Sequence, residues 1–420
     1  MLDEILDLSA DAVRCPYGTY RELRENEPVR WDERAGFFVV TRYADAQRVT
    51  SAPELFSSVN PMGPSIYEAA AAMEQVLPDA PAEARRAADF NRHRGNVLFT
   101  ADPPEHTRHR KLINRALTPR AVTAFEPEIE RLCHRLVDRF APAGRAEIVA
   151  EYAGHVPVVA VARLLGVPDE RTDDFIRMAN SIIAPLGASM SAQDIHACLV
   201  DQSHFFSYFT ELVESRRESP SDDLLSAIVH ARVAGEQPFT LEEILGLASQ
   251  LLAAGLDTTN KLIATTLLRL CEDSELMASV RADPGAVPRL LEEMLRLESP
   301  VQGLFRTATA DTEIGGVPIP AGAMVWVVYA SANRDDAVFD RPDEIELGRP
   351  NLRSHMAFGH GPHFCIGAPL ARAEARIALE VLLDRLDDIR LDESVGCSYL
   401  PSYVMHGVSR LGLLFTARDA

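Results

Sequence analysis

A single cysteine in a glycine-rich loop, followed at once by a helix, is the feature that most constrains this chain. The loop and the start of the helix span residues 358–372 and read FGHGPHFCIGAPLAR. Its glycines, Gly359, Gly361 and Gly367, allow sharp turns and the close approach of a flat ligand. Pro369 suits a first helical turn, where its missing N–H costs nothing. Apolar residues then recur at helical spacing, at Leu370, Ala373, Ile377, Val381 and Leu382.

Cys365 is therefore expected near a helix N-terminus, where the helix dipole and free backbone N–H groups favour a thiolate over a thiol. A thiolate held at the edge of a loop acts as a nucleophile or as a metal ligand. Cysteine also often serves as a small buried hydrophobe, although such a residue does not need three glycines around it. Another alternative is a metal ion shared with three nearby histidines, His355, His360 and His363.

Composition limits the class of protein. The chain has 420 residues, 47% of them hydrophobic, which is enough for a large core. No apolar run approaches a membrane span, and the N-terminal residues 1–7 carry acids where a signal peptide carries bases. We therefore expect a soluble, cytoplasmic protein without membrane contact. The formal charge of −20 argues against a nucleic-acid partner. The six cysteines form no C-x-x-C pair, so neither a disulfide framework nor a zinc ribbon is indicated.

Strand signals are confined to three regions. Val29–Trp31 and Phe37–Thr41 flank a polar turn and predict a hairpin, after which Tyr43–Thr50 looks helical. Met324–Tyr329 and Ser398–Phe415 are also strand-like, the second with a turn at Tyr403–Met405. Residues 57–100 look irregular around one helical piece, Ile66–Val76, and form either a solvated loop or a mobile lid over a pocket.

The middle of the chain is strongly helical. Apolar and charged positions alternate at helical spacing, and Gly187 marks a loop between two of the helices. The predicted helices are Ala121–Phe140, Ile148–Leu165, Glu170–Ile183, Ala192–Glu218 and Ser221–Val233. The fold class predicted from these patterns is mostly α with a smaller β region.

A long helix over residues 241–271 is predicted to lie at the centre of the fold. Thr240 and Glu243 form a capping box at its start. Its middle, Ala254–Thr259, combines a glycine, an acid and two β-branched hydroxyl residues, which are poor helix formers. A buried aspartate such as Asp257 is also costly unless it is paired. These residues indicate either a functional site or a kinked helix with a satisfied polar turn.

Two further pairs have helical spacing. His106 and Arg110 stand four residues apart and share a helix face, which is ordinarily a solvated charged face. Glu293 and Arg296, three residues apart, can form an ion pair within the helix predicted at Pro288–Leu297. At a surface such a pair contributes little.

The order of residues in the cysteine loop resembles the haem-binding loop of the cytochrome P-450 superfamily, the haem-thiolate monooxygenases. The matching positions are Phe358, Gly359, Gly361, His363, Cys365 and Gly367. The His-x-x-x-Arg, Ala-Gly-x-Asp-Thr-Thr and Glu-x-x-Arg segments occur in the family's order. The resemblance implies one catalytic domain over residues 1–420, with a mostly α fold. It places a small β-rich part at about 25–60 and 300–330, and an α-rich part at about 100–300 and 355–390.

The resemblance also assigns roles. Cys365 would be the axial thiolate of a b-type haem, iron protoporphyrin IX, which favours O–O cleavage. Asp257 would relay protons to Thr258, which would hydrogen-bond bound oxygen, beside a dioxygen groove at Ala254 and Gly255. The other cofactor contacts would be His106, Arg110 and Arg306 at the propionates, with Phe358, Gly359, His363 and Gly367 in the loop. Glu293 and Arg296 would be structural, and the substrate pocket would include Val301, Gln302, Gly303, Leu304, Tyr403 and Val404.

The implied reaction inserts one atom of dioxygen into a C–H bond or a double bond of a small molecule. Val301 and Leu304 suggest that this substrate is apolar. No flavin or nicotinamide fingerprint is visible, so a separate ferredoxin and ferredoxin reductase would supply the electrons. The alternatives are a peroxide-driven haem-thiolate enzyme, an oxidative coupling enzyme, or a non-catalytic haem sensor. The Asp257–Thr258 pair argues against the first alternative, since peroxide needs no such proton relay.

Basic residues concentrate on two segments despite the acidic total. They are either solvated helix faces or a docking patch for an acidic ferredoxin. The residues concerned are Arg108, Arg110, Lys111, Arg115 and Arg120 on the first segment, and Arg372 and Arg376 on the second.

Overall fold

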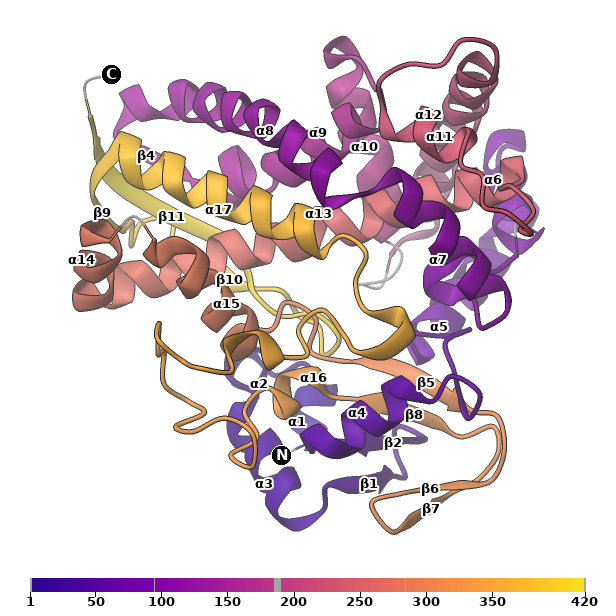
Figure 1. Cartoon of the computed structure of the whole chain (residues 1–420), viewed down its shortest axis with the longest axis horizontal. Helices are drawn as coiled ribbons and strands as arrows, with labels where there is room; N and C mark the ends of the chain where they lie inside the picture. Colours follow the sequence, from indigo (N-terminus) through magenta and orange to yellow (C-terminus); the bar gives the residue numbers. More distant parts are fainter. Residues whose placement is uncertain (1, 94, 185–189, 284, 419–420) are drawn as a thin grey trace. The chain divides into compact units, whose positions relative to one another are not determined.

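The computed structural model describes residues 2–93, 95–184, 190–283 and 285–418. The loop predicted at Gly187 lies outside these residues. By their contacts the residues form two compact units. The first comprises Met1–Phe56, Val122–Pro157 and Asp257–Ala420, and the second comprises Ser57–Ala121 and Val158–Leu256. The elements are labelled in Figure 1. The expectation of one catalytic domain stays a prediction.

A five-stranded sheet lies in the first unit, in the order β1-β2-β8-β5-β3. The predicted hairpin is confirmed, since β1 and β2 pair antiparallel from Val29 opposite Val40 to Asp32 opposite Phe37. β2 pairs in parallel with β8, which lies nearly three hundred residues further along the chain. The strands of this sheet are β1 Val29–Asp32, β2 Phe37–Val40, β3 Phe56–Ser57, β5 Leu304–Ala308 and β8 Met324–Val327. A separate hairpin consists of β6 Thr312–Ile314 and β7 Val317–Ile319.

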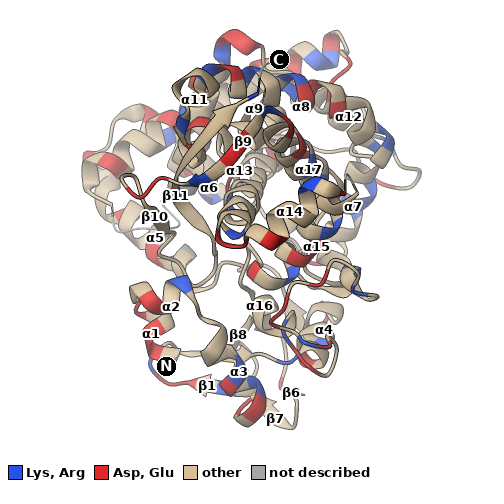
Figure 2. Cartoon of the chain, turned by 90° about the vertical axis from the view of Figure 1, so that its left-hand side faces the viewer, with Lys and Arg blue, Asp and Glu red and all other residues tan. Residues whose placement is uncertain are grey.

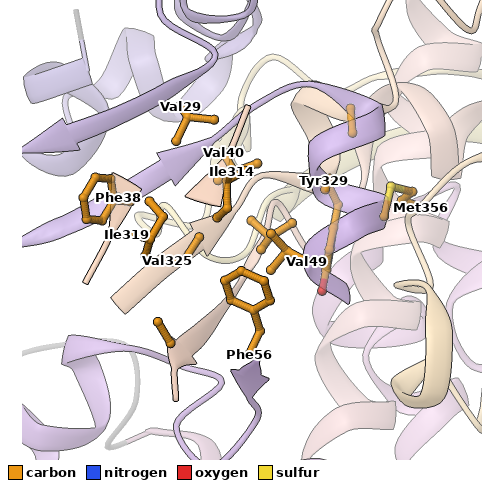
Figure 3. Close-up of a cluster of buried hydrophobic side chains, with 14 residues drawn as sticks. Val29, Phe38, Val40, Val49, Phe56, Ile314, Ile319, Val325, Tyr329 and Met356 are labelled. Atoms are coloured by element: carbon orange, nitrogen blue, oxygen red, sulfur yellow. The ribbon is translucent and has the colours of Figure 1, made fainter. Parts of the chain in front are cut away.

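Branched and aromatic side chains from the sheet pack against helix α4, which spans Tyr43–Ser51. Figure 3 shows this cluster, in which Val40, Val325 and Phe56 from the strands surround Val49 of α4. Such residues favour strands because they fit a pleated, half-buried surface. Tyr329 was expected to end strand β8, but it begins helix α16. The cluster fixes α4, whose C-terminal end in turn supports the cysteine loop.

Helices make up most of the rest of the first unit. They are α1 Leu2–Leu6, α2 Ala10–Arg14, α3 Tyr17–Asn26, most of α8 Pro119–Phe140, the second half of α13 Leu241–Glu272, α14 Ser274–Ala282, α15 Ala286–Glu298, α16 Tyr329–Ala332 and α17 Ala368–Arg385. The capping box of α13 is confirmed, since Thr240 N–H donates to Glu243 Oε2 at 2.9 Å and Glu243 N–H donates to Thr240 Oγ1 at 3.2 Å. With these helices next to its small sheets, the chain confirms the predicted fold class, mostly α with a smaller β region.

A second sheet joins the C-terminal part of the first unit. Its strands are β4 Arg145–Glu147, β9 Leu386–Leu391, β10 Cys397–Tyr399 and β11 Val408–Ala417. The strand-like character predicted over Ser398–Phe415 is confirmed, and the predicted turn at Tyr403–Met405 lies in the segment that separates β10 from β11. Within that turn the backbone bonds to another part of the chain, with Gln302 N–H donating to Val404 O at 2.8 Å and His406 N–H donating to Pro300 O at 2.9 Å.

The second unit is helical. Its elements are α5 Pro64–Val76, α6 Ala82–His93, α7 Glu105–Ala116, most of α9 His155–Leu164, α10 Thr172–Ile183, α11 Ala192–Glu218, α12 Leu224–Val229 and the first half of α13. No helix of the described residues has both the length and the apolar character needed to span a membrane.

Two predictions in the second unit are wrong. Residues 57–100 contain a second helix, α6, which sequence patterning missed because its buried face consists of alanines. It packs on α11, where Asn91 Nδ2 donates to Gln202 Oε1 at 2.8 Å and the rings of Phe90 and Phe206 lie 4.1 Å apart. The helix predicted over Ser221–Val233 is shorter, because the Asp223 carboxylate accepts the Ser226 N–H and caps α12 there.

One predicted helix is divided. The chain over Ile148–Leu165 begins with a π-helical turn, Val149–Ala153, and only then enters α9. A Cβ atom at Gly154, between the two, would lie 2.8 Å from the Val149 carbonyl oxygen. The tight turn therefore depends on this glycine, a constraint that helical periodicity alone does not reveal.

Candidate functional site

The cysteine loop is closed by its own backbone. Cys365 N–H donates to Phe358 O at 2.8 Å, and Gly359 N–H donates to Met356 O at 2.8 Å. Gly359 and Gly361 have φ values of 71° and 70°, a left-handed conformation that favours glycine. A Cβ atom at Gly361 would also collide with the Thr50 carbonyl at the end of α4. The glycines are therefore required by the turn and by a close backbone approach.

Cys365 lies two residues before Gly367, the N-cap of α17, and its side chain is partly exposed. Pro369 occupies the first turn of α17, as predicted. A Cβ atom at Gly367 would lie 3.8 Å from Cys365 Sγ, so glycine keeps that side of the sulfur open. An accessible thiol at a helix N-terminus is suited to be a thiolate ligand.

The alternative of a shared metal ion with three histidines finds no support. Among the described residues no group of three or more His, Cys, Asp or Glu side chains is arranged to hold a metal ion. His355 instead hydrogen-bonds Glu292 at 3.1 Å, and His360 lies 3.4 Å from Gln47 Nε2. A lone thiolate is a suitable donor set for a metal whose remaining ligands come from a bound macrocycle.

Glu292 of α15 ties the cysteine loop to the helix behind it. Arg372 of α17 donates to Glu292 from Nη2 at 3.0 Å, and its guanidinium lies 4.5 Å from the centre of the Phe358 ring. Burial opposes ionisation of Glu292, but the hydrogen bonds from His355 and Arg372 lower its pKa to about 2. Sequence analysis missed this residue, because its partners lie 63 and 80 positions away.

The predicted Glu293–Arg296 pair is present and fully buried. Arg296 donates to both carboxylate oxygens of Glu293, at 2.8 and 2.9 Å, and both side chains are 0% exposed. Arg296 also donates to the carbonyls of Pro342 at 2.6 Å and Glu344 at 2.9 Å. Arg349, which the sequence did not single out, adds a bond from Nε to Glu293 at 3.0 Å. Burial opposes ionisation, but the Arg296 hydrogen bonds hold the pKa of Glu293 below its usual value.

Arg306 on β5 tests whether the site fits a haem. Its side chain is 4% exposed, yet among the described residues no carboxylate forms an ion pair with it. Arg306 Nη1 donates a hydrogen bond to the carbonyl of its neighbour, Phe305 O, at 2.7 Å. The buried Tyr329 hydroxyl lies beside it: burial raises the pKa of Tyr329, and the guanidinium opposes that rise. A buried cation needs an anionic partner, and a propionate carboxylate would satisfy that need.

The polar turn of α13 is paired rather than frustrated. The helix runs from Leu241 to Glu272 in one piece. Asp257 Oδ1 lies 2.9 Å from Lys261 Nζ, one turn further along the helix. The lysine side chain is 5% exposed and the aspartate side chain is 20% exposed, and the Thr258 side chain is partly exposed. Sequence analysis expected a partner for Asp257 but missed Lys261, although the spacing of four residues could have revealed it.

The two segments expected to line a substrate pocket meet in the first unit. An isolated bridge joins Val301 to Met405, next to the hydrogen bond between Gln302 and Val404. The pocket-lining prediction is not supported for Gln302, because its side chain is 2% exposed and its amide donates to Glu298 O at 3.2 Å and Ser299 O at 2.9 Å.

The other predicted pocket residues differ in exposure. A Cβ atom at Gly303 would collide with the Val327 carbonyl on β8, so this glycine serves the close pairing of backbone segments. Val404 is 3% exposed. Val301, Leu304 and Tyr403 keep partly exposed side chains. The Tyr403 ring lies 5.5 Å from the Trp326 ring. These three residues remain the candidates for contact with a substrate.

In the second unit, His106 and Arg110 lie on α7. His106 is buried and Arg110 is half-buried. The next histidine, His109, ties α7 to the start of α13 through Glu243 at 3.1 Å and accepts the Leu98 N–H at Nδ1. Desolvation lowers the pKa of His109, although Glu243 opposes that shift.

Ala254 and Gly255 lie on the part of α13 that belongs to the second unit, where Ala254 is exposed. A Cβ atom at Gly255 would lie 3.3 Å from Val161 Cγ2 on α9. The glycine therefore allows α9 and α13 to pack closely, besides any role in a dioxygen groove.

The basic residues of the predicted docking patch are largely engaged within the chain. Arg376 pairs with Glu126 at 2.6 Å and with Glu380 at 2.9 Å. Lys111 pairs with Glu236 at 2.6 Å. Arg372 pairs with Glu292, and Arg108 pairs with Glu243. Figure 2 shows Lys and Arg interleaved with Asp and Glu on the helices. Arg115 and Arg120 are exposed, and no ion pair links them to another described residue.

Comparisons with known proteins agree with this site. A family model described as "Cytochrome P450" matches residues 185–388. The "Cytochrome P450 monooxygenase PikC" of Streptomyces venezuelae is 34% identical over 417 residues, which cover 97% of this chain and 93% of PikC. The solved structure of cytochrome P450 CYP109Q5 from Chondromyces apiculatus is 35% identical, with a TM-score of 0.82 and coverage of 98% of both chains.

A structure of CYP109E1 from Bacillus megaterium in complex with corticosterone is 30% identical, with a TM-score of 0.83 and coverage of 96% of this chain and 98% of that chain. The likenesses thus run through nearly the whole length of both partners. The cysteine loop, the Asp-Thr turn and the buried Glu-x-x-Arg pair lie within the aligned length. The chain therefore belongs to the cytochrome P-450 superfamily and is a haem b oxidoreductase of the monooxygenase type.

Proposed function

We propose that Cys365 binds the haem iron as a thiolate, and that the enzyme hydroxylates or epoxidises an apolar small molecule with electrons from a separate ferredoxin and its reductase. The observation that carries the proposal is the partly exposed Cys365 thiol at the start of α17, in a loop whose geometry requires glycine at Gly361. A thiolate-ligated haem supplies the activation of dioxygen and the transfer of one of its oxygen atoms.

The basic side chains would hold the two carboxylates of the haem. Arg306 is buried on β5 without a carboxylate partner among the described residues, which supports its assignment to a propionate. His106 and Arg110 share one face of α7 and would serve the same purpose. Glu292 and Arg372 would keep the cysteine loop in place from behind, since both bond within the first unit.

The polar turn of α13 would supply protons for the reaction. The Thr258 hydroxyl would donate a hydrogen bond to dioxygen, and the Asp257 side chain would take up a proton from water and pass it to the hydroxyl. The partial exposure of Asp257 supports this role, because the group must exchange protons with water.

The proposed substrate is an apolar small molecule, such as a terpenoid, a steroid, a fatty acid or a polyketide. Val301 and Leu304 offer apolar, partly exposed side chains, and Tyr403 offers an aromatic face. A relative of similar fold holds corticosterone. A spectral titration against these four classes tests the proposal, because binding of a substrate next to the haem is expected to change its absorption spectrum.

The thiolate assignment has its own test. Reduced protein under carbon monoxide is expected to show the red-shifted absorption band of haem-thiolate proteins, and Cys365→Ala is expected to lose it. Cys397→Ala, which removes an exposed cysteine elsewhere in the first unit, is the matched control and should keep the band. Haem-loaded wild-type protein without the band, or a Cys365→Ala variant that retains it, would contradict the proposal.

A further inference from the structure

We propose that Lys261 is the positioning residue of the proton relay: its buried side chain bonds the Asp257 side chain and sets the orientation from which Asp257 serves Thr258. The inference rests on the proposed roles of Asp257 and Thr258. It goes beyond them in placing the counter-ion of the relay on the same helix, one turn away.

The geometry of the pair supports this. Lys261 Nζ lies 2.9 Å from Asp257 Oδ1, within hydrogen-bond distance. The lysine side chain is 5% exposed, so its ammonium has little water to replace a lost partner, whereas the aspartate is 20% exposed. A buried charge that loses its partner is strongly unfavourable. The pair therefore holds the aspartate in one orientation while leaving it an exposed face through which protons can enter.

The lysine stem is held from the outside by the start of β11. Gly407 has a φ of 139°, and a Cβ atom there would lie 2.7 Å from Lys261 Cβ and 3.1 Å from Lys261 Cγ. The next residue, Val408, donates its N–H to Thr265 Oγ1 at 3.2 Å. The backbone thus lies directly on the lysine and restricts its side-chain conformations. The ammonium is therefore held next to Asp257, as a positioning role requires.

The contact between Gly407 and Lys261 also links the relay to residues 300–304 and 403–404, which include the residues proposed to line the substrate pocket. Gly407 follows the turn over residues 403–406, which bonds to residues 300–302 through the Val404 carbonyl and the His406 N–H. His406 is further anchored by Glu298 at 3.2 Å. A movement of this turn on substrate binding would therefore reach Lys261 through Gly407.

The use of lysine at this position is distinctive for the chain. Lys111 and Lys261 are its only lysines, and every other permanently cationic side chain is an arginine. Lys111 is half exposed and pairs with Glu236. Lysine is a compact point charge on a flexible stem, and it fits a narrow buried space next to a single carboxylate better than the broad guanidinium.

The consequence for catalysis follows from this geometry. Without Lys261 the Asp257 side chain would lose the contact that fixes its orientation next to Thr258. Proton delivery to Thr258 would then be slower, as is expected when Asp257 itself is replaced.

The experiment compares Lys261→Met, Asp257→Asn and the double variant in turnover with saturating substrate. We expect Lys261→Met to lower the turnover number several-fold and to alter its solvent isotope effect, while substrate affinity changes little. If Lys261 acts through Asp257, the double variant should be no slower than Asp257→Asn alone. Arg418→Met removes a surface charge paired with Asp387 and serves as the control with unchanged turnover.

A second readout needs no turnover. Protein labelled with 15N-lysine contains two labelled side chains, and Lys111→Met identifies the Lys261 signal in the diamagnetic carbon-monoxide form. Asp257→Asn should shift this signal and increase its exchange with water, even if Lys261→Met fails to fold. A normal turnover number in Lys261→Met, or a Lys261 signal that is unchanged in Asp257→Asn, would overturn the inference. Wild-type protein without the thiolate band would instead overturn the proposed function.

Discussion

At the scale of single residues, three side chains of α13 carry the proposed proton relay. Asp257 and Thr258 stand next to each other on α13, where their polar groups are poor helix formers. The helix nevertheless runs through them, because Lys261 pairs with Asp257 and packing supports the rest. A local conflict between propensity and structure of this kind is expected at functional positions.

The relay gives a direct prediction at this scale. Thr258→Ala should retain haem and substrate binding but divert reducing equivalents to peroxide, because the hydroxyl that hydrogen-bonds oxygen is lost. Asp257→Asn should chiefly slow turnover, by about 10²-fold, since a protonatable group is removed. Product, peroxide and electrons consumed are measured together. Thr258→Ser, which keeps the hydroxyl, is the control, and unchanged product per reducing equivalent in Thr258→Ala would refute the relay.

A second residue-scale prediction concerns Glu374 of α17. Its side chain is 1% exposed, and burial raises its pKa well above the ordinary 4.5, although the Thr259 hydroxyl opposes that rise. The folded protein therefore keeps a proton that the unfolded chain releases, and this lowers stability as pH rises above the unfolded pKa. The loss is about 1.4 kcal/mol per pH unit until the folded pKa is reached.

Glu374→Gln is neutral at every pH, so it should remove this loss. We expect the variant to equal the wild type near about pH 4 and to exceed its unfolding free energy at about pH 8. Denaturant unfolding of the haem-loaded protein at both pH values measures the difference. Glu211→Gln, on the exposed side of α11, is the control. A pH-independent difference between Glu374→Gln and the wild type would show that Glu374 is ionised when folded.

At the scale of elements, α15 carries two adjacent glutamates with different tasks. Glu292 connects to α17 and the cysteine loop through Arg372 and His355. Glu293 connects to residues 342–349 through Arg296 and Arg349. One helix thus fixes both the loop that holds the thiol and the segment that precedes it. Contacts from α15 therefore support the loop from outside it.

Removing one partner of the buried pair should be costly. Glu293→Gln leaves Arg296 and Arg349, 0% and 1% exposed, without a compensating charge. We expect it to lower the free energy of unfolding by about 3–5 kcal/mol. Glu214→Gln breaks a pair of the same spacing at the surface, with Arg217, and should cost under about 1 kcal/mol. Similar losses for the two variants, in urea unfolding, would mean that Glu293 is not structural.

At the scale of the whole molecule, the negative net charge affects how a redox partner can dock. A formal charge of −20 would repel an acidic ferredoxin, so docking needs local positive charge. Most of the basic residues first considered are neutralised by carboxylates of this chain. Arg115 and Arg120 are exposed, and no ion pair links them to the described residues, which leaves them as the better candidates.

Reversing one of these charges gives a prediction. Arg115→Glu should slow reduction by an acidic ferredoxin, more strongly at low than at high ionic strength, because steering is screened by salt. Substrate titrations should be unchanged. Stopped-flow reduction is the measurement, with Arg410→Glu on β11 as the control for net charge. If both variants respond alike, the effect belongs to the total charge and not to a docking site at Arg115.

The sequence by itself determined the features that depend on neighbours along the chain. The glycines of the cysteine loop, the hairpin at Val29–Trp31 and Phe37–Thr41, the capping box at Thr240 and the spacing of Glu293 and Arg296 were all readable, because turns, caps and helix faces involve residues a few positions apart. The long motif around Cys365 also sufficed to recognise the family.

The tertiary structure alone decided how distant parts of the chain meet. Helix α6 forms because small alanines let it pack on α11. The Gln302 side-chain amide is buried because carbonyl groups at the end of α15 accept its hydrogen bonds. The partners of Glu292 and the backbone that covers Lys261 come from segments 63–80 and about 145 positions away. Local pattern carries no information on such pairings, since they follow from packing that the whole chain must satisfy at once.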